Sequence, residues 1–192
     1  MSLDEEERRE YYRIDDRIAL EIHVLTDSEA SETGLLQDAS PLFNLLSELH
    51  LSEFESQHLL RQVNEADRTL ANFLKAQNKR IDLLSQVVAQ TLLNRIGEPQ
   101  PVTLSEGGIT LSQARPMRPG TALSIKMALM PQALGLLLRA QVVHCSEQPN
   151  AEGLFEIGTE FVALADAQRQ LLARYILQRQ QQERRLARDQ LE

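Results

Sequence analysis

The stretch from Ser52 to Ile96 contains no proline and no glycine. Because these two residues are the strongest helix breakers, the stretch predicts one long helix over about residues 53–96. Ser52 and Glu55 have the spacing of a capping box at its start, and Gly97 and Pro99 follow its end. At 1.5 Å per residue such a helix is roughly 65 Å long, about twice the diameter of a small domain. A chain of 192 residues therefore cannot bury it against one domain alone.

A heptad repeat along this helix predicts the surface through which it assembles. Most a and d positions are apolar, and they form an oligomer seam of Leu60, Val63, Leu70, Leu74, Ile81, Leu84 and Val88. Asp67, Gln77 and Thr91 interrupt this seam, and we interpret them as residues that fix its register. Apolar residues at the g positions widen the stripe, which favours a coiled-coil homo-oligomer between a dimer and a tetramer. The alternative is a helix that lies across its own domain.

Outside this helix the sequence alternates in the manner of β-strands. Six short segments carry alternating apolar residues and are joined mainly by turns, at about residues 18–25, 102–104, 109–111, 123–129, 136–145 and 154–164. Such a series predicts a closed or nearly closed antiparallel β-barrel in an α+β fold. From Asp166 the period is helical, and the predicted buried side consists of Leu171, Leu172, Tyr175 and Ile176.

These patterns divide the chain into three segments. Residues 1–25 are expected to form an N-terminal arm and the first strand. Residues 26–98 are expected to form a helical insertion, in which a short helix at about residues 41–50 precedes the long one. Residues 99–192 are expected to complete the barrel and to end in a C-terminal helix.

The charge balance excludes several classes of partner. The chain has 28 acidic and 20 basic residues and a formal net charge of −8, which argues against binding to nucleic acid. No apolar run is long enough for membrane insertion, and the charged start does not have the pattern of a signal peptide. Since Cys145 is the only cysteine, we expect a reducing, cytoplasmic location.

Three short motifs fall within the predicted barrel. Arg8, Arg9 and Arg13 follow the spacing R-R-x-x-x-R just before the first predicted strand. The segment 103–108 reads TLSEGG and lies between the second and third predicted strands, and IGTEFVALADAQRQLLARYI at 157–176 closes the barrel region. In this order and at these places the motifs resemble the PilZ domain family. The resemblance covers about residues 5–25 and 99–178, on either side of the helical insertion.

The resemblance implies both a fold and a ligand. PilZ domains are six-stranded barrels that receive the bacterial second messenger cyclic di-GMP, so the long helix would be an insertion between the first and second strands. The ligand-binding residues that it implies are Arg8, Arg9, Arg13, Thr103, Ser105 and Gly108.

The chemistry of the ligand fits these residue types. Cyclic di-GMP carries two phosphates and two guanines, and the planar donor fork of arginine pairs with phosphate or with guanine O6 and N7. Ser105 offers a hydroxyl, and Gly107 and Gly108 permit a close backbone approach. Thr103 stands where the family has Asp or Asn, and its one hydroxyl cannot accept both guanine donors, a loss of about 1–3 kcal/mol.

The sequence therefore predicts a non-enzymatic cyclic di-GMP-binding signalling or adaptor protein that oligomerises and acts on a downstream protein partner. No nucleophile, phosphate-loop or zinc-protease motif is present. His144 and Cys145 are adjacent on a predicted strand and face opposite sides, so no metal site and no cofactor are expected. The alternative function is a degenerate PilZ-like oligomeric scaffold or docking protein that no longer binds cyclic di-GMP.

Overall fold

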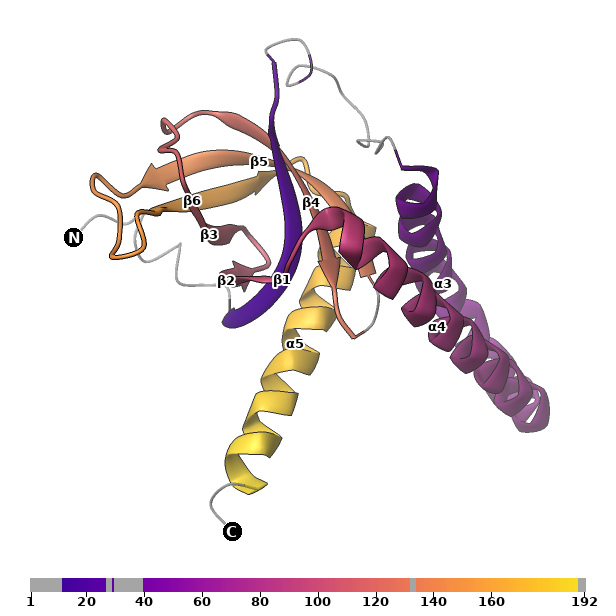
Figure 1. The fold of residues 1–192 in the computed structure, drawn as a ribbon. Helices are drawn as coiled ribbons and strands as arrows, with labels where there is room; N and C mark the ends of the chain where they lie inside the picture. Colours follow the sequence, from indigo (N-terminus) through magenta and orange to yellow (C-terminus); the bar gives the residue numbers. More distant parts are fainter. Residues whose placement is uncertain (1–11, 27–28, 30–39, 132–133, 190–192) are drawn as a thin grey trace, which may run out of the picture.

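The computed structural model describes residues 12–26, 29, 40–131 and 134–189, and its centre is a closed β-barrel (Figure 1). The strands are β1 (Arg13–Val24), β2 (Gln100–Ser105), β3 (Ile109–Gln113), β4 (Ala122–Leu129), β5 (Leu134–Cys145) and β6 (Phe155–Val162). They follow the order β1-β2-β3-β6-β5-β4 around the barrel, and the paired strands are antiparallel. The structure confirms the predicted six-stranded antiparallel barrel in an α+β fold.

Strand β1 contributes to closure by pairing with a different strand along each half of its length. Its first half, Arg13–Ile18, pairs with β2, and its second half, Ala19–Val24, pairs with β4. The strand thus begins at Arg13, earlier than the predicted start near Ile18. Because the barrel is closed, each described strand is paired with a neighbour on both sides over at least part of its length.

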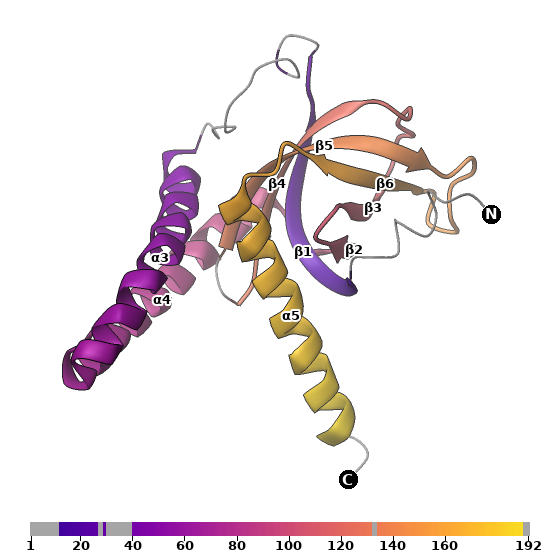
Figure 2. The same ribbon diagram turned by 180° about the vertical axis from the view of Figure 1, so that it is seen from behind.

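The barrel interior is apolar and receives side chains from every strand. Its buried residues include Ile14, Ile18, Leu104, Ile109, Leu123, Ile125, Met127, Leu138 and Ile157. Helix α5 (Asp166–Asp189) packs its first turns on the barrel and then projects away from it (Figure 2). The residues that it buries are Leu171, Leu172, Tyr175 and Ile176, which confirms the predicted buried side. Each fully buried aliphatic side chain contributes about 1.5–3 kcal/mol of hydrophobic stabilisation.

The helical insertion is a hairpin of two helices, so the prediction of a short helix and one long helix is wrong. Helix α3 (Pro41–Ala66) and helix α4 (Arg68–Ile96) run side by side, and Asp67 separates them. Asp67 has an extended backbone (φ −147°, ψ 103°), and its N–H donates to the Val63 carbonyl at 2.7 Å. The same residue therefore ends one helix and begins the next.

The Asp67 side chain explains why the chain can reverse here without glycine or proline. Its Oδ1 accepts hydrogen bonds from the backbone N–H groups of Thr69 at 2.8 Å and Leu70 at 3.0 Å. This is the N-cap arrangement, which satisfies donors that the first turn of a helix leaves unpaired. Asp67 is thus a helix cap and not a polar position within a continuous heptad seam. Helix α3 also continues through Ser52, so the predicted helix start there is not used.

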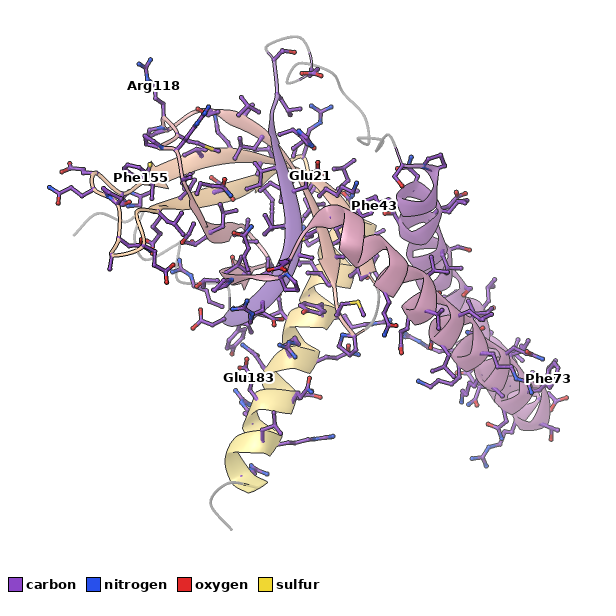
Figure 3. The ribbon with its side chains drawn as sticks, viewed as in Figure 1. Glu21, Phe43, Phe73, Arg118, Phe155 and Glu183 are labelled. Atoms are coloured by element: carbon purple, nitrogen blue, oxygen red, sulfur yellow. The ribbon has the colours of Figure 1, made fainter. Side chains whose placement is uncertain are left out.

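The open end of the hairpin packs on the outer face of β1, β4 and β5. Phe43 of α3 is fully buried there in a small apolar cluster with Ala19, Ala128 and Ile96. Figure 3 labels Phe43 at this base, together with Glu21 of β1 and with Phe73 near the far end of the hairpin. The ammonium of Lys126 lies 4.9 Å from the centre of the Phe43 ring.

Candidate functional site

The candidate site begins at the first residue of β1. Arg13 is exposed, and its register partner on β2 is Ser105. Partners on antiparallel strands share one face of the sheet, with Cβ atoms about 4.5–5.5 Å apart. The structure therefore brings Arg13 next to the turn that joins β2 and β3. Arg8 and Arg9 lie outside the described residues.

The turn between β2 and β3 is closed by Ser105 and Gly108. The Ser105 backbone N–H donates to the Gly108 carbonyl at 2.9 Å. The Ser105 hydroxyl donates to the same carbonyl at 3.1 Å and accepts from the Gly108 N–H at 3.2 Å. Because a hydroxyl oxygen has two lone pairs, one lone pair remains for a ligand. The hydroxyl thus first holds the turn in shape.

Gly108 is required by the protein's own packing. A Cβ built on Gly108 would lie 2.0 Å from the carbonyl oxygen of Thr159 on β6. The Gly107 carbonyl accepts a hydrogen bond from the Phe161 N–H of the same strand at 2.8 Å. These two glycines thus allow the turn to approach β6 closely, which holds the turn against the barrel.

A carboxylate that the sequence reasoning did not include lies beside this turn. Asp15 is paired in register with Thr103, and the Thr103 hydroxyl donates to its Oδ1 at 2.7 Å. The prediction missed Asp15 because it placed the start of the strand at Ile18. Once the strand is known to begin at Arg13, its period of two puts Asp15 on the same face as Arg13.

Polar side chains of two neighbouring strands form one row, exposed on β1 and half-buried on β2, which we call the β1–β2 strip. The strip consists of Arg13, Asp15 and Arg17 of β1 with Thr103 and Ser105 of β2. Arg17 is exposed, and its Nη2 donates to the Pro99 carbonyl at 2.8 Å. Successive members on one strand are about 6.6–6.8 Å apart along it. The strip therefore alternates cationic donors with acceptors at regular intervals.

The residue between two members of the strip faces α5 instead of solvent. Asp16 has a side chain that is 5% exposed and accepts from the Tyr175 hydroxyl at 2.6 Å and from Arg179 Nε at 2.8 Å. Arg179 Nη2 also donates to Asp16. Burial and the hydrogen bond to Asp16 raise the pKa of Tyr175, and the hydrogen bond to Asp16 raises the pKa of Arg179. This cluster joins α5 to the strand that carries the candidate site.

The predicted oligomer seam is divided between the two helices of the hairpin. Leu60 and Val63 lie on α3, and the other seam residues lie on α4. Leu70, Ile81 and Leu84 are 45–68% exposed, whereas the remaining seam residues are half-buried within the single chain. Phe73 and Val87, at predicted g positions, are also exposed, at 59% and 64%.

Two further kinds of feature, metal clusters and membrane-spanning helices, are absent from the described part of the chain. No group of three or more His, Cys, Asp or Glu side chains is placed to hold a metal ion among residues 12–26, 29, 40–131 and 134–189. In the same ranges, no helix combines the length and the apolar character that crossing a membrane requires.

Comparisons with known proteins agree with the geometry of the barrel. The family model of the PilZ domain matches residues 74–178. Among solved structures, a pathogenic protein from Xanthomonas campestris is similar over 96% of this chain and 90% of its own, with a TM-score of 0.52 and 17% identity. That protein is described as a tetrameric PilZ domain self-assembled via an unusual helical bundle.

Two further solved structures are similar over less of the chain. The Bacillus subtilis inhibitor of motility, MotI/DgrA, has a TM-score of 0.38 and 23% identity and covers 43% of this chain and 41% of its own. The PilZ domain of Escherichia coli YcgR, solved with c-di-GMP, has a TM-score of 0.37 and 19% identity, with coverages of 46% and 79%. No curated protein matches the sequence.

Proposed function

Because the chain belongs to the PilZ domain family, we propose that it is a non-enzymatic receptor for cyclic di-GMP that assembles through its helical hairpin. The observation that carries the first part is the register of β1 and β2, which pairs Arg13 with Ser105. One arginine of the R-R-x-x-x-R motif thereby lies beside the turn of the second motif. In this proposal the receptor acts in the cytoplasm and passes the signal to a protein partner.

Arg8 and Arg9 are close enough to Arg13 along the chain to reach the same ligand site. An extended chain spans at most about 3.3–3.6 Å per residue, so Arg9 and Arg8 have a reach of roughly 14 and 18 Å from Arg13. Arginine forks at this end of the barrel would supply a local cationic site in a chain whose net charge is −8. A small ligand with two phosphate charges needs only such a local site, unlike a nucleic acid.

The test of binding is isothermal titration of the full chain with cyclic di-GMP. We expect the double variant Arg8→Ala/Arg9→Ala and the single variant Arg13→Ala each to weaken binding by roughly tenfold or more, because each loses charged hydrogen bonds. The control is Arg115→Ala/Arg118→Ala, which removes the same charge as the double variant from exposed positions between β3 and β4. If the control lost as much cyclic di-GMP affinity as the double variant, the effect would come from net charge alone and not from arginines at this site.

Assembly is proposed from the apolar residues that the hairpin leaves exposed. Leu70, Phe73, Leu84 and Val87 lie on α4 with 46–68% of their surface open to solvent in the single chain. A second copy that covered them would remove about 25 cal/mol of unfavourable free energy per Å² of apolar surface. The self-assembly described for the Xanthomonas campestris protein is in line with this proposal.

Oligomeric mass tests the second part independently. We expect light scattering to give a dimer to a tetramer for the wild-type chain and smaller species for Phe73→Glu/Leu84→Glu. Gln90→Glu is the matched control, since Gln90 is an exposed polar residue of the same helix. A wild-type monomer at micromolar concentration would contradict the assembly part. Assembly without any ligand binding would support the alternative function, an oligomeric PilZ-like scaffold or docking protein.

A further inference from the structure

We infer that Asp15, held in place by Thr103, recognises the guanine of the ligand by accepting hydrogen bonds from its N1–H and N2–H groups. This inference rests on the proposed function and names a specificity residue for the same site. It is carried by one contact and one arrangement: the hydrogen bond between Thr103 and Asp15, and the position of Asp15 between two arginines on the β1–β2 strip.

The Thr103 hydroxyl orients the carboxylate and still leaves it able to accept. The hydrogen bond from Thr103 Oγ1 to Asp15 Oδ1 is 2.7 Å long and exposed. An ionised carboxylate has about four acceptor positions on its two oxygens, and this contact occupies one of them. Two parallel acceptors therefore remain for the two neighbouring N–H donors of a guanine. The ligand would meet a carboxylate that is already held in one orientation, which reduces the ordering needed on binding.

The arrangement of charge on the strip matches the two edges of guanine. Arg13 and Arg17 lie two residues before and two residues after Asp15 on the same face of β1. Guanine O6 and N7 are acceptors that pair with an arginine fork, whereas N1–H and N2–H are donors that pair with a carboxylate. A carboxylate would repel the phosphates of a dinucleotide, so its place between the arginines suits a base and not a phosphate.

The same geometry discriminates against adenine. The corresponding edge of adenine presents an acceptor at N1 and a donor at N6, so it offers the Asp15 carboxylate only one donor and one repelling lone pair. A polar site built for two donors rejects a ligand that leaves one of its acceptors unpaired. We therefore expect the wild-type chain to bind cyclic di-GMP more tightly than cyclic di-AMP.

The experiment is titration of the full-length wild type and variants with both cyclic dinucleotides. Asp15→Asn keeps the shape of the side chain but places an amide N–H₂ against a guanine donor. We expect it to weaken cyclic di-GMP binding by roughly tenfold or more and not to weaken cyclic di-AMP binding, because the amide can donate to adenine N1 and accept from adenine N6. Thr103→Val removes the orienting hydroxyl and is expected to lower the same selectivity, and Thr103→Ser is expected to restore it.

A matched control and a stability measurement separate recognition from folding. Glu156→Gln removes one exposed carboxylate from β6 and is expected to change neither affinity. The melting temperature of Asp15→Asn is expected to equal that of the wild type, because Asp15 is exposed. Cyclic di-GMP affinity within about threefold of wild type in Asp15→Asn, or equal losses for both dinucleotides, would overturn the inference. A wild-type chain that binds no cyclic di-GMP would overturn the proposed function, and with it this inference.

Discussion

Replacing Asp16 with alanine tests how firmly α5 is joined to the barrel, and we expect a loss of about 3 kcal/mol in the free energy of unfolding. The variant removes a carboxylate that accepts from the Tyr175 hydroxyl and from two nitrogens of Arg179. Truncating one partner of a buried ion pair typically costs about 3–5 kcal/mol. We expect the lower end of this energy range because the structure leaves both hydrogen-bond donors an alternative partner.

Both donors retain some compensation when Asp16 is absent. The Arg179 side chain is 25% exposed, so its guanidinium regains water in the variant. The Tyr175 hydroxyl lies 3.2 Å from the Met130 carbonyl and keeps this acceptor. A loss of about 3 kcal/mol in a chain of this size lowers the melting temperature by about 6–12 °C.

Urea unfolding followed by circular dichroism, together with a thermal scan, would measure this loss. Asp15→Ala is the control, because it removes a neighbouring carboxylate whose hydrogen bond is exposed and should therefore cost less than about 1 kcal/mol. A double-mutant cycle with Arg179→Ala isolates the ion pair. If Asp16→Ala and Asp15→Ala lost the same small amount, the buried cluster would not anchor α5 and the reasoning would fail.

Three further predictions concern single residues. The free energy of unfolding is expected to fall above about pH 10, because the folded state raises the pKa of Tyr175 above its unfolded value and so favours the protonated hydroxyl. The fall continues as the pH rises towards the folded pKa. Tyr175→Phe should reduce this dependence on pH in urea unfolding, and an unchanged dependence would contradict the assignment to Tyr175. Gly108→Ala is expected to destabilise the barrel by about 1–3 kcal/mol or more, since its Cβ would lie 2.0 Å from the Thr159 carbonyl oxygen. A melting temperature equal to that of the wild type would show that β6 can shift to make room for the Cβ at little cost. Asp67→Ala is expected to lose about 1 kcal/mol, whereas Asp67→Asn, which keeps an acceptor, should lose much less; equal losses would argue against capping.

The strands and the buried side of α5 were predictable because they depend on local periodicity. Alternation of apolar residues marks β4 and β5, and the spacing of Leu171, Leu172 and Tyr175 marks the face of α5 that the barrel covers. These patterns depend only on residues that are close in the sequence, and the apolar side of each element is the side that the core buries.

The start of β1 was not predictable from alternation, because Asp16 interrupts it. A period of two puts Asp16 on the side of Ile14 and Ile18, where a carboxylate is unexpected. Only Tyr175 and Arg179, more than 150 residues further along the chain, make this burial possible. A tertiary interaction thus hid the strand start, and with it the position of Asp15.

The reversal at Asp67 was missed for a different reason. A helical pattern without proline or glycine continues on both sides of it, and the break depends on one side chain that caps α4. Asp is common within exposed helices as well as at their starts, so its identity alone does not separate the two cases. The heptad pattern remained apolar across the reversal because both helices need an apolar face.

The reversal at Asp67 changes how many helices each copy of this chain would bring to an assembly. A single helix that carries a wide apolar stripe needs between one and three further copies to cover it in a dimer to a tetramer. The hairpin brings α3 and α4 together within each chain, so in the proposed assembly two copies would contribute four helices and four copies would contribute eight. It also returns the chain to the barrel that it left, because β1 precedes α3 and β2 follows α4. Every copy would therefore carry its barrel at the open end of its own hairpin, with the Asp67 turn at the other end.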